Sequence, residues 1–216
     1  MQSRRKPPAP SERSIRILLD RYACPVPYHE VRTRFLGAIA SPLMNGSPFQ
    51  LVKNFWGGEL PPFDSLDDLN ELVGVLINGL WNDLTKHQKR GAPFRLVRIT
   101  ANATAIDLGR YALIRQQELD GFVEGLFNGE PDIDLPERAH EALGALGEMR
   151  AMMAGICDLV ARDTKAESKT TMEATFGHVR ELTRIMELEI HELILSCARA
   201  RRQMANILAT DIPTTH

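Results

Sequence analysis

The strongest constraint on the fold is a repeat of apolar residues in the C-terminal part of this 216-residue chain. Over residues 135–160, and again over residues 172–207, apolar side chains recur at alternating intervals of four and three. This is the a/d spacing of helices that pack along their whole length. A polar stretch over residues 162–170 separates the two repeats. We therefore expect two long helices joined by a polar turn, which form an antiparallel hairpin.

The second of these helices carries more apolar surface than one seam can bury. Its last turns, residues 198–208, outrun the first helix, and five further apolar side chains lie off the seam: Leu182, Ile185, Leu188, Ile194 and Leu195. Both features require cover. We expect a second copy of the chain to supply it, in a homodimer or larger assembly through the C-terminal helices. A hairpin packed against residues 11–127 within one monomer satisfies the same pattern.

The preceding residues predict a helical body. Serines at positions 11, 47 and 65 stand where helix N-caps are expected, and Asn128 with Gly129 supplies a helix stop. Residues 91–103 fit either a short extended segment or irregular packing. Residues 1–10 are rich in proline and basic side chains and are expected to be a disordered tail.

The predicted fold class is therefore all-α. A multi-helix bundle body over residues 11–130 is followed by a long antiparallel helical hairpin over residues 131–216. The low aromatic content of 6% agrees with helices, because strands favour aromatic and β-branched residues.

Composition indicates the class of protein and its expected cellular location. Hydrophobic residues make up 44% of the chain and charged residues 25%, as in an ordinary globular protein. No apolar run approaches the roughly 20 residues that span a bilayer, so no membrane contact is expected. Three cysteines lie far apart in the sequence, which favours reduced thiols and a cytoplasmic location: Cys24, Cys157 and Cys197.

Residues 35–127 resemble the YecA-like, YgfB-type family of bacterial all-helical proteins. The resemblance rests on the segments 35–40, 49–63 with Phe55-Trp-Gly-Gly-Glu59, the helix through Asn82, and 118–126. It implies an all-helical fold and no established biochemical activity. Several members carry a cysteine-rich zinc-binding tail, whereas this chain ends in residues 207–216 without cysteine, so no metal function is implied.

The segment Trp56, Gly57, Gly58 and Glu59 is the candidate interaction surface. An indole beside a glycine turn offers a flat face with backbone donors nearby, which suits a partner or ligand. The structural alternative is that Trp56 closes a short helix and that the glycines end it.

Catalytic and metal-binding patterns are missing from the sequence. The nearest to a metal pair is Glu187 with His191, one helical turn apart and next to Glu192, and these are expected on a solvent-facing helix surface. There is no serine elbow, no thiol with a histidine nearby and no phosphate-cradling glycine loop. We expect no catalytic residues, no cofactor and no metal.

A local basic patch is the last candidate feature. It contains six cations and one acid, Asp107, and an acidic run over residues 59–71 opposes it; the cations are Lys86, Lys89, Arg90, Arg95, Arg98 and Arg110. Such charge runs are typical of solvated surface or of a docking dipole, more often than of a nucleic-acid site.

Together these observations favour a non-enzymatic interaction or regulatory protein with an unknown protein partner. The alternative is an enzyme, metal-dependent or otherwise, whose site is assembled from residues distant in sequence. A weak nucleic-acid binder that uses the basic patch is the third option.

Overall fold

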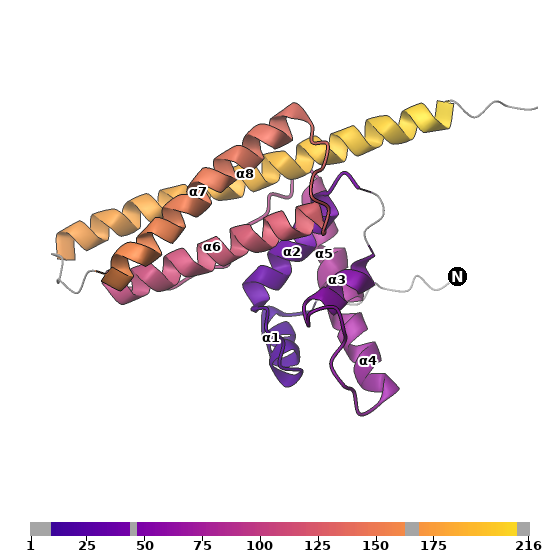
Figure 1. The fold of residues 1–216 in the computed structure, drawn as a ribbon, viewed down its shortest axis with the longest axis horizontal. Helices are drawn as coiled ribbons and strands as arrows, with labels where there is room; N and C mark the ends of the chain where they lie inside the picture. The colour runs from indigo at the N-terminus through magenta and orange to yellow at the C-terminus, as the bar shows by residue number, and fades with distance from the viewer. Residues whose placement is uncertain (1–9, 44–46, 163–168, 211–216) are drawn as a thin grey trace, which may run out of the picture.

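The computed structural model describes residues 10–43, 47–162 and 169–210, and its regular structure in these ranges is helical without a strand. Figure 1 shows long helices lying across a cluster of shorter ones. The predicted all-α class is confirmed. The predicted tail lies outside the described residues except for Pro10, and most of the predicted polar turn, residues 163–168, also lies outside them.

The N-terminal half of the chain forms short helices. These are α1 (Glu12–Arg21), α2 (Tyr28–Ala40), α3 (Pro48–Asn54) and α4 (Leu66–Val73). A π-helical stretch (Gly74–Trp81), α5 (Asn82–Leu84) and a 3-10 turn (Thr85–Gln88) continue directly from α4.

The helix ends follow the predicted capping residues. The side chains of Ser11, Ser47 and Ser65 each accept a hydrogen bond from a backbone N–H three residues later. Thr104 caps the next long helix, α6 (Ala105–Phe127), in the same way. That helix ends at Asn128, whose φ of 48° is the left-handed conformation of a C-terminal stop.

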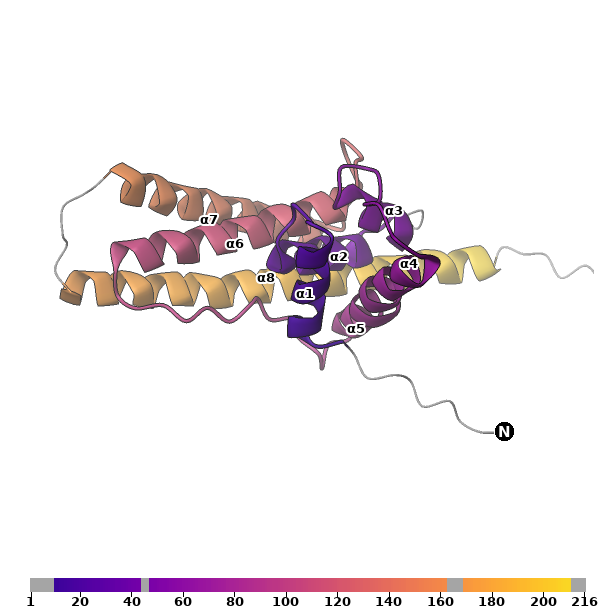
Figure 2. The same ribbon diagram turned by 90° about the horizontal axis from the view of Figure 1, so that it is seen from below.

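Two long helices complete the fold. They are α7 (Glu137–Arg162) and α8 (Lys169–Thr210), and they form the predicted antiparallel hairpin. Helix α7 begins two residues later than the expected start at Leu135. Figures 1 and 2 both show α6, α7 and α8 side by side, with the C-terminal end of α8 running past the others. Within the described ranges, no helix is both long enough and apolar enough to cross a membrane.

One hydrophobic core joins the body and the hairpin. Helix α6 packs against α2 on one side and α7 on another, and α8 contacts both α7 and α2. Leu126 of α6, Leu146 of α7 and Ile190 of α8 are all essentially buried in this core. The body therefore covers much of the hairpin, including Ile194, which the seam alone left unexplained.

Glycines allow the closest helix crossing, between α2 and α6. A methyl group on Gly37 would collide with the backbone carbonyl of Phe122, and one on Gly125 with that of Arg34. Only residues without a side chain let two helix backbones approach this far. Gly37 and Gly125 also belong to two of the segments that carry the family resemblance, so those segments pack on each other.

Residues 91–103 connect the shorter helices to α6 without regular structure. Figure 2 shows this segment running alongside α6 and α8. Phe94 at its start is fully buried, and Leu96 and Val97 are nearly so. The segment is thus irregular packing inside the fold, as one of the two sequence expectations had it, and its backbone needs hydrogen-bond partners from neighbouring side chains.

Candidate functional site

The candidate surface Trp56–Glu59 lies immediately after α3. The indole Nε1 of Trp56 donates a hydrogen bond to the carbonyl of Tyr22 at 2.8 Å, and its half-buried ring tilts against Phe55. Gly57 and Gly58 have φ values of 79° and 104°, which other residues rarely adopt. These contacts give Trp56 a role in holding the α1–α2 turn against α3, and the interaction surface itself stays a prediction.

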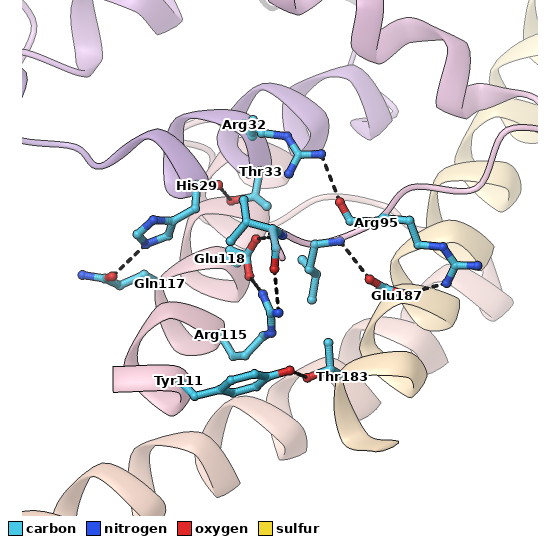
Figure 3. Close-up of polar contacts among 12 residues, drawn as sticks. His29, Arg32, Thr33, Arg95, Tyr111, Arg115, Gln117, Glu118, Thr183 and Glu187 are labelled. Carbon is cyan, nitrogen blue, oxygen red and sulfur yellow. Dashed lines mark hydrogen bonds and ion pairs between the residues drawn. The ribbon is translucent and has the colours of Figure 1, made fainter. Parts of the chain in front are cut away.

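A buried ion pair organises the centre of the molecule (Figure 3). Glu118 and Arg115, one turn apart on α6, pair with each other at side-chain exposures of 0% and 3%. Both also reach the backbone of Val97: its N–H donates to Glu118 Oε1 at 2.8 Å, and Arg115 Nη2 donates to its carbonyl at 2.8 Å. The pair therefore supplies a hydrogen-bond partner to each of the two backbone polar groups of Val97.

A second carboxylate, Glu187 of α8, holds the adjoining residues. The backbone N–H of Leu96 donates to Glu187 Oε1 at 3.0 Å, and the guanidinium of Arg95 donates to Oε2 at 2.6 Å (Figure 3). From the other side, Arg32 of α2 donates to the carbonyl of Arg95 at 3.0 Å. Side chains from α2, α6 and α8 thus fix the segment in one position.

The expectation that Glu187 and His191 face solvent is wrong. Glu187 has a side-chain exposure of only 12%, and His191 is buried, with its Nε2 3.4 Å from the carbonyl of Arg90. The a/d pattern identifies the face of α8 that meets α7, but it carries no sign that the flank beside it packs on residues 90–97.

Burial shifts the pKa of a carboxyl group and of two thiols in the protein. Burial raises the pKa of Glu118 above its ordinary value, and the charge of Arg115 opposes that rise. Burial also raises the pKa of Cys24 and of Cys197 to about 11, so both thiols are protonated at neutral pH. Among the described residues, no group of three or more potential metal ligands comes together.

The predicted basic patch separates into two groups. Three of its cations are ion-paired: Lys86 with Asp83 at 2.7 Å, Arg95 with Glu187 at 2.6 Å and Arg110 with Asp107 at 3.1 Å. Lys89, Arg90 and Arg98 form no ion pair with any residue in the described part of the chain. The patch is therefore not one continuous basic surface.

Lys89 and Arg90 instead face α8 across a cleft of about 380 Å³. The other side of the cleft carries two arginines, Arg199 and Arg202, and the full lining is Gln88, Lys89, Arg90, Glu192, Leu195, Arg199 and Arg202. Sequence reasoning did not identify this cleft. About a hundred residues separate the two walls, so no local pattern could have joined them.

The C-terminal end of α8 is the most exposed helical part of the structure. Every residue from 202 to 207 is exposed, and among them Met204 and Ile207 keep 46% and 60% of their surface in water. Nearer the middle of α8, Ile185 and Leu188 are also exposed, at 41% and 55%.

Comparisons of this chain with protein-family models, with curated proteins and with solved structures gave no match.

Proposed function

We propose that the protein is a non-enzymatic interaction protein that pairs with a second copy of itself through helix α8. The observation that carries this proposal is the exposed end of that helix, residues 202–207, which extends beyond the body (Figure 1). Most helical stability in proteins comes from packing an apolar face, and a helix without such packing is marginal in water. The end of α8 therefore favours a packed neighbour.

The exposed apolar side chains on α8 are spaced for helix packing. Met204 and Ile207 lie three residues apart, as do Ile185 and Leu188, and residues at this interval share one face of a helix. Met204 and Ile207 continue the seam stripe of α8 beyond the end of α7, where Arg138 pairs with Glu189, whereas Ile185 and Leu188 lie off that stripe on another face. A second copy of the chain packs on the stripe at residues 204–207, because a two-fold axis lets the same helix serve both partners.

The family proposal has separate support. We propose that the chain shares the helical core of YecA-like, YgfB-type proteins, because segments 35–40 and 118–126 lie in α2 and α6 and meet at the glycine crossing. Because the resembling segments lie in the helical core, the proposed kinship extends to the fold of the body. The hairpin is then the part that is specific to this chain.

Light scattering after size-exclusion chromatography tests the pairing. At micromolar concentration, the intact chain should have twice the mass of one chain. Changing both Met204→Lys and Ile207→Lys should give the monomer mass without loss of helicity, because two charges would then enter the apolar contact.

A matched control places the same charges on the body. Ile106 and Leu66 are exposed at 82% and 78%, and the double change Ile106→Lys with Leu66→Lys should leave the dimer intact. A monomeric mass for the intact chain would refute self-association. Loss of the dimer in the control as strongly as in the α8 variant would refute the assignment to α8.

A further inference from the structure

The cleft between residues 88–90 and α8 has an unbalanced charge. Its walls carry four cations, Lys89, Arg90, Arg199 and Arg202, against one carboxylate, Glu192. None of these four forms an ion pair with another residue of the described ranges, whereas the neighbouring Lys86 does. Like charges held around one cavity repel one another, and an anion between them relieves that repulsion.

The walls of the cleft are fixed relative to each other. Gln88 accepts a hydrogen bond from Arg201 Nη2 of α8 at 2.9 Å, and the carbonyl of Arg90 lies 3.4 Å from Nε2 of the buried His191. The guanidinium of Arg202 is also tethered, because its Nε donates to the Ala198 carbonyl at 3.0 Å, which leaves its terminal nitrogens available. A site whose donors are already in place binds a ligand at a lower entropic cost.

Arg201, the residue before Arg202 on α8, adds another positive charge near the cleft. Arg201 is partly buried, and burial lowers the pKa of its guanidinium. The charge of Arg202 acts in the same direction. Together with Arg199 and Arg202, Arg201 places three arginines within four residues of α8.

The lining also restricts the kind of anion. A volume of about 380 Å³ suits a small molecule. Leu195 is the one apolar residue of the lining, and no aromatic residue is present on which a base could stack, as single-stranded nucleic-acid sites require. Guanidinium and ammonium donors are the groups that bind phosphate oxygens best.

We propose that this cleft binds a compact polyphosphate, either free or as the phosphate chain of a nucleotide. Arg199 and Arg202 contact its oxygens from α8, and Lys89 and Arg90 contact them from the opposite wall. Glu192 lies at the same cavity and limits the excess of positive charge.

Isothermal titration calorimetry with sodium tripolyphosphate tests the site on the full chain at low salt. The double variant Arg199→Gln with Arg202→Gln should weaken binding by about tenfold or more, because even one lost hydrogen bond to a charged group costs that much. The control variant Arg13→Gln with Arg184→Gln removes two exposed arginines elsewhere and should bind like the unmodified chain. Circular dichroism and light scattering should show the same helicity and mass for both variants.

ATP and a twelve-nucleotide single strand complete the experiment. Equal affinities for tripolyphosphate and ATP would support a site for the phosphate chain, whereas binding of ATP without tripolyphosphate would overturn it. No heat from tripolyphosphate at millimolar concentration, or equal weakening in both variants, would also overturn the proposal. Tighter binding of the oligonucleotide that is lost in the cleft variant would reassign the cleft to nucleic acid.

Discussion

Arg95 lies in the irregular segment and Arg90 directly precedes it, only five residues away, yet the two side chains meet opposite charges on helix α8. Arg95 donates to Glu187 of α8 at 2.6 Å, while Arg90 lines a cleft with Arg199, further along α8. Between Glu187 and Arg199, the charge that α8 presents to these residues changes from negative to positive. The contrast shows that a basic run in sequence has no single electrostatic role, because each cation takes its role from the level of α8 that it faces.

The largest loss of unfolding free energy should come from breaking the buried ion pair between Arg115 and Glu118. Glu118→Gln keeps a side-chain oxygen for the Val97 N–H but leaves the charge of Arg115 buried without its partner. Loss of one member of a buried ion pair costs about 3–5 kcal/mol of unfolding free energy. Urea denaturation followed by circular dichroism measures the change.

A double substitution distinguishes a buried charge from a simple packing defect. Arg115→Met together with Glu118→Leu removes both charges, so the double variant should be more stable than Glu118→Gln alone. It should still be less stable than the unmodified chain, because both backbone groups of Val97 lose their partners. A cost below about 1 kcal/mol for Glu118→Gln would mean that water reaches the pair.

A smaller effect is expected at Glu187, where the partner arginine is 67% exposed. Glu187→Gln keeps an acceptor for the Leu96 N–H but loses the ion pair with Arg95, which should cost about 1 kcal/mol of unfolding free energy. Hydrogen exchange at the Leu96 amide should become faster, because that bond becomes neutral. Glu181→Gln, which removes an ion pair with Arg184 at exposures of 60% and 73%, is the matched control and should change neither quantity measurably.

Sequence reasoning could recover the parts of this fold that depend on local order. The serine caps, the left-handed stop at Asn128 and the heptad spacing of the hairpin each follow from residues within a few positions of one another, and the structure has them. The α2–α6 crossing was not foreseen, because Gly37 and Gly125 reveal their role only when both helices are placed.

The polar contacts around residues 95–97 were missed for a related reason. Glu187 looked like a surface residue because its helix has a regular seam on another face, and nothing near it in sequence marks Leu96 as its partner. The prediction of a basic patch was incomplete for the opposite reason. Its members are neighbours in sequence, but the fold pairs some with acids and turns others toward the arginines of α8.

The smallest predicted effect concerns the unfolding free energy, which should change in opposite directions when an unpaired cation of the cleft and an ion-paired cation are replaced. Lys89→Gln removes one of several like charges around the cleft, so the unfolding free energy should stay within about 0.5 kcal/mol and should rise slightly at low salt. Arg95→Gln loses the pair with Glu187, so it should lower the unfolding free energy under the same conditions. Both differences should shrink in about 1 M salt, where the screening length falls to about 3 Å. Thermal melts of the two variants at low and high salt measure this. A clear loss of stability in Lys89→Gln at low salt would mean that Lys89 has an attractive partner, and the cleft would then lack the unbalanced charge that an anion needs.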